Sequence, residues 1–96
     1  MNFIRLMIVR VRDAQAHYRL ERDLCEVQDY LALESGYLHS EVWSQDDGTL
    51  VMLMTMWASR DAALQFHASG FNDLLTAIVK RHIVGSPLVQ IYRIIC

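Results

Sequence analysis

The sequence predicts a single α+β domain of the ferredoxin-like type, with the element order βαββαβ, a four-stranded antiparallel sheet and both helices on one face of that sheet. Three observations support this prediction. Strand-like runs rich in β-branched and large apolar residues stand near both ends of the 96 residues. Two further such runs flank an Asp-Gly pair in the middle, and the remaining intervals show helical periodicity. A chain of this length has room for one core, so residues 1–96 are expected to form one domain.

The first third of the chain predicts one strand and one long helix. Phe3 to Arg12 is the strand candidate, and Asp13 follows at the position of a helix N-cap. The helix is predicted from Asp13 to Leu33, because apolar residues recur there at spacings of four, three and four: Leu20, Leu24, Val27 and Leu31. Gly36 then marks the end of the helical segment.

A β-hairpin is predicted next. Ser40 to Gln45 and Thr49 to Trp57 are both strand-like, and Asp46-Asp47-Gly48 stands between them. An Asp-Gly pair between two such runs favours a tight turn, because Gly accepts the positive φ that the turn requires.

The last third predicts a second helix and a final strand. Ser59 is a capping residue ahead of a helical pattern that runs to about Val84, with Gly70 as a candidate break. Gly85-Ser86-Pro87 is expected to end this helix, and Leu88 to Ile95 is the last strand candidate.

The third predicted strand is apolar on both faces. Successive side chains of a strand point to opposite sides, which separates Val51, Leu53, Thr55 and Trp57 from Leu50, Met52, Met54 and Met56. Right-handed crossovers place both helices on the same side of the sheet, so one of these faces has no cover within the chain. We therefore expect a homodimer that packs sheet to sheet with the methionines in its seam. The alternative is that the methionines form an adaptable ligand surface.

Composition excludes several classes of function. The formal charge is −2 and the acids and bases are mixed, so there is no basic stripe of the kind that binds nucleic acid. No apolar run approaches the roughly 20 residues of a membrane span, and no export signal is recognisable, so we expect a cytoplasmic protein without membrane contact. Cys25 and Cys96 are interpreted as free thiols. His17, His39, His67 and His82 lack metal-site spacing, and we expect neither a metal nor any other cofactor.

Four short motifs, in their order and spacing, resemble the antibiotic biosynthesis monooxygenase family: Gly36-Tyr37-Leu38, Asp47-Gly48, Met56-Trp57-Ala58-Ser59 and Phe66-His67-Ala68-Ser69. The resemblance covers nearly the whole chain. It implies a dimeric α/β barrel in which each subunit is a βαββαβ unit with a pocket between sheet and helices. It also implies one of several chemistries, namely cofactor-independent oxygenation of polycyclic aromatic polyketides, haem degradation or isomerisation of small metabolites.

Individual positions separate these chemistries. The oxygenase members are similar to this chain at Trp57, but their Asn four residues earlier is Leu53 here, and their Tyr six residues later is Ala63. At the positions of the Asn, Trp and His of the haem-degrading members, this chain has Met7, Phe66 and Thr76. Because the His that would bind haem iron is absent, haem degradation is not expected.

His67 and Trp57 are the leading functional candidates. A neutral imidazole can take a proton from a phenol or an enolisable carbon, so His67 is the candidate catalytic base, with a solvated helix histidine as the alternative. The Trp57 indole can stack on a planar substrate and donate one hydrogen bond, or it simply closes the core. The other residues expected around the substrate pocket are Leu53, Thr55, Phe66, Phe71 and Asn72. Whether Tyr92 or any strand arginine faces this pocket is left open by the sequence: Arg5, Arg10, Arg12 and Arg93.

Taken together, these features predict a cofactor-free, oxygenase-like homodimer that binds a small apolar or aromatic molecule, for example of polyketide type. The deprotonated substrate would itself reduce dioxygen, so that the protein need only bind, desolvate and deprotonate it. Two alternatives remain open. One is a non-catalytic ligand-binding or stress-response dimer, and the other is a small-metabolite isomerase of the same superfamily.

Overall fold

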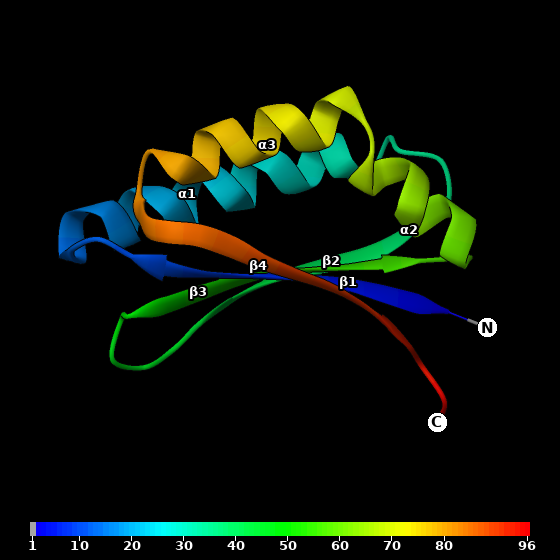
Figure 1. Ribbon diagram of the computed structural model, residues 1–96, viewed down its shortest axis with the longest axis horizontal. Helices are drawn as coiled ribbons and strands as arrows, with labels where there is room; N and C mark the ends of the chain where they lie inside the picture. The colour runs from blue at the N-terminus through cyan, green and yellow to red at the C-terminus, as the bar shows by residue number, and fades with distance from the viewer. Residues whose placement is uncertain (1) are drawn as a thin grey trace.

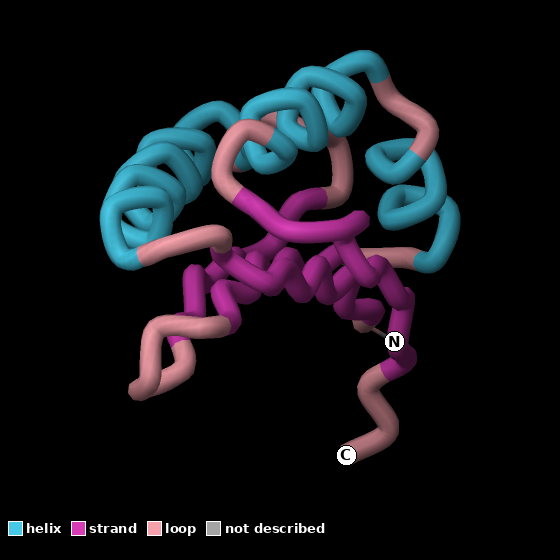
Figure 2. The backbone as a smooth tube through the Cα atoms, turned by 60° about the vertical axis from the view of Figure 1, so that its left-hand side comes forward, coloured by secondary structure: helices cyan, strands magenta, loops and turns pink. Residues whose placement is uncertain are grey.

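The computed structural model describes residues 2–96 and shows a layer of helices packed on one face of a four-stranded sheet (Figures 1 and 2). The predicted element order is confirmed, with the second helical segment divided in two. The elements are β1 (Phe3–Val11), α1 (Ala14–Leu31), β2 (Tyr37–Ser44), β3 (Leu50–Trp57), α2 (Arg60–His67), α3 (Gly70–Lys80) and β4 (Ile83–Arg93).

The strands are ordered β2-β3-β1-β4, and all neighbours are antiparallel. The two halves of the chain therefore interleave, because β1 lies between β3 and β4 (Figure 1). Figure 2 shows that all three helices cover the same face, as right-handed crossovers require. The ferredoxin-like α+β fold expected from the sequence is thus present in the monomer.

Helix α1 forms as its sequence pattern predicts. Asp13 adopts an extended backbone, and its carboxylate accepts a hydrogen bond from the Ala16 amide at 2.7 Å, which satisfies one of the free N–H groups of the first turn. The apolar stripe faces the sheet and is fully buried at Leu20 and Leu24. The chain then turns at Gly36, which has a φ of +81°.

The helical segment is broken at Ala68 and Ser69, and Gly70 is the first residue of α3. The Ser59 hydroxyl caps α2 by accepting from the Ala62 amide, and the Ser69 hydroxyl caps α3 by accepting from the Asn72 amide. The two caps give α2 and α3 independent starting points, so the chain changes direction between them (Figure 1).

Three predicted boundaries differ from the structure by three residues or more. Strand β2 begins at Tyr37 rather than Ser40, and α3 ends at Lys80 rather than near Val84. Strand β4 begins at Ile83 rather than Leu88, because Gly85-Ser86-Pro87 does not precede the strand but lies inside it. The register jumps there from Ile8 opposite Leu88 to Arg10 opposite Val84, so this segment is a bulge. An edge strand tolerates such a bulge and its Pro, since no further strand needs the missing N–H.

The two faces of the sheet differ as the alternation predicts. Side chains on the helical side are buried on β1 and β3, and they form the core together with the apolar stripes of the helices: Met7, Val9, Val11, Val51, Leu53 and Trp57. The opposite face is also mostly apolar, although no helix covers it (Figure 2): Ile4, Leu6, Ile8, Leu50, Met52, Met54, Met56 and Leu88. We call this second surface the open face.

Candidate functional site

A cluster of polar side chains surrounds Arg5 beneath the junction of α2 and α3. Arg5 is only 1% exposed, although it carries a guanidinium group. Its Nη2 donates to Asn72 Oδ1 at 2.8 Å, and its Nε donates to His67 Nδ1 at 3.3 Å. The guanidinium also lies over the Phe66 ring, 5.1 Å from the ring centroid. Strand β1 and the facing ends of two helices thus meet at one buried cation.

Local structure explains how each member of the cluster is held. Alternation along β1 places Arg5 on the helical face with Met7 and Val9. Asn72 lies in the first turn of α3, and its Nδ2 donates to the His67 carbonyl at 2.9 Å, which ties the start of α3 to the end of α2. The Asn72 amide has two hydrogens and one oxygen, so it bonds the helix end and Arg5 at the same time.

The electrostatics of Arg5 are unusual. Burial lowers its pKa to about 10, so the guanidinium stays positively charged at neutral pH. Among residues 2–96, Nη1 is buried without a hydrogen-bond partner, and the groups that contact the guanidinium are all uncharged or aromatic. A buried charge costs free energy unless it is paired, and an acceptor for Nη1 would offset part of this cost.

His67 combines exposure with a fixed tautomer. The residue is exposed at the end of α2, while its Nδ1 accepts from Arg5. A guanidinium has no lone pair, so the imidazole must be the acceptor, and a neutral ring then carries its hydrogen on Nε2. The only lone pair of that ring therefore points toward the buried cation.

Trp57 is part of the core. It is fully buried, and its Nε1–H donates to Thr55 Oγ1 at 2.8 Å. Thr55 Oγ1 in turn donates to the Arg5 carbonyl at 3.3 Å. The indole stacks on Phe66 with centroids 5.0 Å apart, and it packs nearly perpendicular to the Tyr37 ring with centroids 6.1 Å apart. The hydrogen bond that the indole could give to a substrate is thus already given to the protein.

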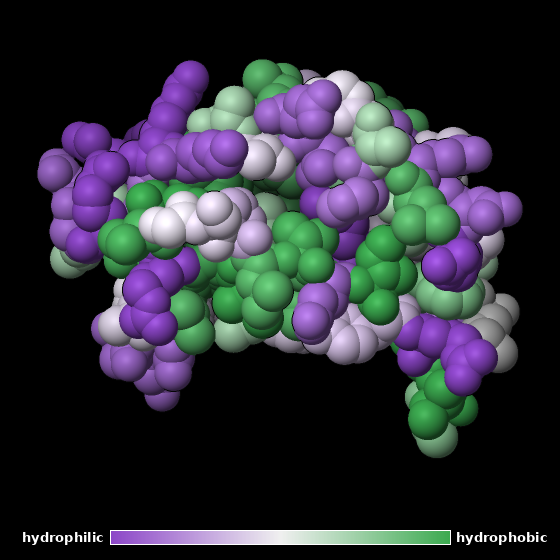
Figure 3. Space-filling view, viewed as in Figure 1, coloured by the Kyte–Doolittle hydropathy of each residue, from purple (hydrophilic) through white to green (hydrophobic). Residues whose placement is uncertain are grey.

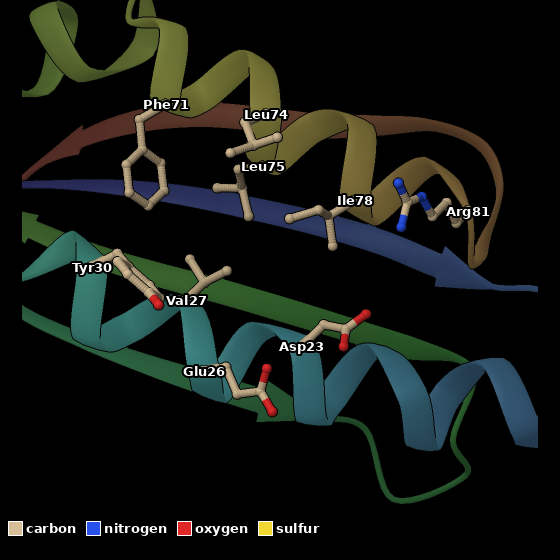
Figure 4. A pocket seen from close by; sticks show the side chains of 9 residues that line it. All are labelled: Asp23, Glu26, Val27, Tyr30, Phe71, Leu74, Leu75, Ile78 and Arg81. Carbon is tan, nitrogen blue, oxygen red and sulfur yellow. The ribbon is translucent and has the colours of Figure 1, made fainter.

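A groove with a largely apolar lining lies between α1 and α3 (Figure 4). Its volume is about 350 Å³, which lies within the range typical of small-molecule sites. Figure 4 shows apolar side chains of α3 facing α1 across the groove, with Phe71 at one end and Arg81 at the other. The lining residues are Asp23, Glu26, Val27, Tyr30, Phe71, Leu74, Leu75, Ile78 and Arg81. This composition suits an apolar or aromatic ligand.

Two further hollows lie nearer to α2. A small cavity of about 70 Å³ lies beside Trp57 and Phe66. A shallow groove of about 480 Å³ lies between α2 and the end of the sheet, with Arg60 and Arg93 among its lining residues. Figure 3 shows the side of the molecule at which β4 is the edge strand of the sheet. Apolar side chains gather across the middle of this side, below the more polar helical layer.

The expected pocket residues are close together but do not enclose one open cavity. Trp57 and Phe66 line the small cavity, whereas Phe71 lines the groove between α1 and α3. Leu53, Thr55 and Asn72 are buried and line none of these hollows. The rings still connect the parts, because Phe66 contacts both Trp57 and Phe71, the latter at 6.0 Å between centroids.

The structure shows where each of the four strand arginines lies relative to the polar cluster. Arg5 belongs to the cluster, whereas Arg10 is exposed near the other end of β1, Arg12 is exposed just beyond that end, and Arg93 is exposed on β4. Tyr92 pairs with Ile4 on the open face. The sequence did contain a signal for Arg5, since it shares its strand face with three buried apolar residues.

Within residues 2–96, no helix is long and apolar enough to cross a membrane. The same part of the chain contains no group of three or more His, Cys, Asp or Glu side chains that could hold a metal ion. Cys25 and Cys96 are both exposed and unbonded.

Several solved structures have the same fold. Rv0793 from Mycobacterium tuberculosis is 17% identical with a TM-score of 0.82, and the match covers 100% of this chain and 97% of that one. The monooxygenase ActVA-Orf6 of Streptomyces coelicolor, solved with nanaomycin D, is 20% identical with a TM-score of 0.81, over 95% of this chain and 85% of that one. SnoaB, a cofactor-independent oxygenase from Streptomyces nogalater, is 15% identical with a TM-score of 0.78, over 97% and 92%.

Sequence comparison identifies the family. No curated protein shows significant sequence similarity to the chain. The family model described as antibiotic biosynthesis monooxygenase, in contrast, matches residues 3–78, which include every element from β1 into α3. Since this match spans most of the 96 residues and the fold agrees with it, the chain belongs to the antibiotic biosynthesis monooxygenase family.

Proposed function

We propose that the protein is a cofactor-independent, monooxygenase-like enzyme that acts on a small aromatic or polyketide-type molecule. The observation that carries this proposal is the position of the apolar groove between α1 and α3. The groove ends at Phe71, the residue next to Asn72, and Asn72 binds Arg5. An aromatic body in the groove would thus reach Phe71, which contacts Phe66, the ring that lies against Arg5. Family membership supports the proposal, as do the activities named for ActVA-Orf6 and SnoaB.

The proposed site uses the aromatic residues as walls. Phe71 is half-buried between the groove and Phe66. In this proposal, rotation of its ring gives the substrate access from the groove to the cluster. Trp57 holds Phe66 by stacking and does not offer its own N–H. Its role in this proposal is to position the aromatic wall rather than to bind substrate by a hydrogen bond.

His67 is the proposed base, and its geometry specifies which atom acts. Nδ1 holds the lone pair of the neutral ring, and its 3.3 Å contact with Arg5 is long for a hydrogen bond. A substrate hydroxyl that replaces this contact can give its proton to Nδ1. The electron-rich anion then reduces dioxygen directly, so no flavin, haem or metal is needed in this scheme.

The test is dioxygen uptake by metal-free protein with a panel of anthrones and hydroquinones. We expect uptake by the wild-type protein and a loss of at least about 100-fold in His67→Ala, the lower end of the usual contribution of a general base. His17→Ala is the matched control, because His17 is a helix histidine that bonds Ser44 rather than the cluster. Equal activity of both variants would refute the assignment of His67.

A binding protein without turnover is the second candidate. Leu53 and Ala63 are both buried and apolar at the positions where the oxygenase members carry Asn and Tyr, so two polar groups are absent. Saturable binding of the same aromatic compounds without dioxygen uptake would favour this candidate. Their conversion without oxygen would indicate the isomerase alternative instead.

We also propose that the protein works as a homodimer joined through the open face. Leu6 and Ile8 are half-buried there, and Leu88 is 53% exposed, which leaves an apolar sheet face in water in the monomer. A second copy offers a matching face of the same kind. Sedimentation should give a dimeric mass for the wild-type protein and a monomeric mass for Leu6→Glu. Leu33→Glu is the control, because Leu33 is exposed beyond the end of α1. A monomeric wild-type protein would refute the dimer.

A further inference from the structure

We propose that Arg5 holds the substrate as an oxyanion, which specifies the substrate class as an aromatic molecule with an ionisable phenol or enol hydroxyl. This inference rests on the site of the proposed function, but not on the oxygen reaction. Arg5 would be a substrate-binding residue, with Asn72 holding its guanidinium in place.

The unpartnered Nη1 is the main evidence. A guanidinium has five N–H donors in a rigid plane, and the side-chain bonds in the described structure use donors on Nε and Nη2 alone. Nη1 is buried and has no acceptor among residues 2–96. Buried polar groups are nearly always bonded, and a guanidinium N–H is a charged donor suited to the lone pairs of an oxyanion.

The surroundings of Arg5 favour an aromatic anion over a hydrated inorganic one. The Phe66 ring lies against the guanidinium, and the Trp57 and Phe71 rings lie against Phe66. This apolar environment strengthens the attraction between opposite charges, because it excludes the water that would screen them. An ionised phenol supplies both the negative oxygen and a flat apolar body.

The cluster also provides a balanced proton transfer. The substrate O–H bond breaks as an N–H bond forms at His67 Nδ1, and the electron pair stays on the oxygen. The new oxyanion forms beside the guanidinium of Arg5, while the imidazole becomes positively charged. Nothing is oxidised or reduced in this step, so no co-reactant is required.

Arg60 and Arg93 offer a rival anion site, because both line the shallow groove beside α2. Both are exposed, so water solvates their charges and screens any bound anion. Arg93 therefore serves as the matched control for Arg5: it is also a strand arginine, and it differs chiefly in burial.

The test compares binding of two probes by titration calorimetry. 4-Nitrophenol is studied at a pH at which it is ionised, and 4-nitroanisole has a similar body that cannot ionise. We expect the wild-type protein to prefer the phenolate by at least about tenfold, as charge-assisted hydrogen bonds do in buried sites. Arg5→Met should remove this preference, Arg5→Lys should keep part of it, and Arg93→Met should leave it unchanged. Circular dichroism checks that each variant is folded.

Several outcomes would overturn the inference. They are a wild-type protein that binds both probes equally, an Arg5→Met variant that keeps the preference, and an Arg93→Met variant that loses it. If Arg5→Met does not fold, the difference in affinity of the wild-type protein for the two probes still tests the inference. The outcome is also separate from that of the oxygenase proposal. Arg5-dependent phenolate binding without dioxygen uptake would keep the oxyanion site and refute the oxygenase, and uptake without such binding would do the reverse.

Discussion

The hydrogen bond between Trp57 and Thr55 offers a direct test of how the core supports the site. Both residues are fully buried, and the indole N–H donates to the threonine hydroxyl at 2.8 Å. Thr55→Val keeps the side-chain shape but removes the acceptor, while Trp57→Phe removes the donor and part of the ring. Together the two substitutions form a double-mutant cycle around one buried bond.

The expected magnitudes follow from burial. Thr55→Val leaves a buried indole N–H without a partner, which should lower the free energy of unfolding by about 1–3 kcal/mol. Trp57→Phe should lower it by about 2 kcal/mol, through the lost hydrogen bond and the cavity left by the smaller ring. The double variant should be less destabilised than the sum by about 1 kcal/mol, because Thr55→Val no longer leaves an unpaired N–H.

Urea unfolding followed by far-ultraviolet circular dichroism provides the measurement, since the loss of Trp57 alters the fluorescence signal. Protein concentration must be equal in all samples, because self-association adds a concentration-dependent contribution to stability. Strictly additive effects would refute the argument that this bond holds the core. A large loss of affinity for aromatic probes in Trp57→Phe, with little loss of stability, would show instead that the indole binds substrate.

Two further predictions concern turns. Gly36→Ala should destabilise the protein by about 1–3 kcal/mol, because Gly36 has a φ of +81° and an added Cβ would lie 2.5 Å from Ala62 Cβ. Gly70→Ala is the control in thermal unfolding. It should be nearly neutral, because no atom lies within 4 Å of the added Cβ. Hydrogen bonds from Thr49 to the Asp47 carboxylate lower the pKa of Asp47 below 3.8. The stabilisation that these bonds give the folded protein is therefore complete above pH 3.8, and it is lost as the pH falls through the lowered pKa. NMR titration of Thr49→Val should show the pKa of Asp47 moving back toward 3.8, and an unchanged value would contradict this cause.

Local patterns were sufficient to predict most elements. The α1 stripe, the Asp13 cap and the Asp-Gly hairpin were found from the sequence because each depends on residues close in the chain. The predicted start of β4 was wrong, because that boundary depends on residues far apart in the chain. Gly85-Ser86-Pro87 has the composition of a turn, yet pairing of Ile83 and Val84 with β1 keeps the segment within the sheet as a bulge. Long-range hydrogen bonds decided that boundary.

The candidate site was predicted less completely than the fold. His67, Asn72 and Phe66 were expected near a pocket, and they do surround a common point. That point is Arg5, which the sequence did not distinguish from the three other strand arginines. Trp57 was expected either beside the substrate or as a residue that closes the core, and its N–H bonds Thr55, two residues earlier on the same strand face.

The sequence by itself determined the element order, the antiparallel hairpin, and the presence of two apolar faces on one sheet, because side-chain alternation and capping act over a few residues. The tertiary structure alone decided which polar groups meet. Arg5 and Asn72 are 67 positions apart, and only the placement of β1 beneath the α2–α3 junction brings them within hydrogen-bond distance. The same placement removes water from the guanidinium and leaves Nη1 without an acceptor. Burial and unmet hydrogen bonding are properties of the packed chain, and they make Arg5 the centre of the candidate site.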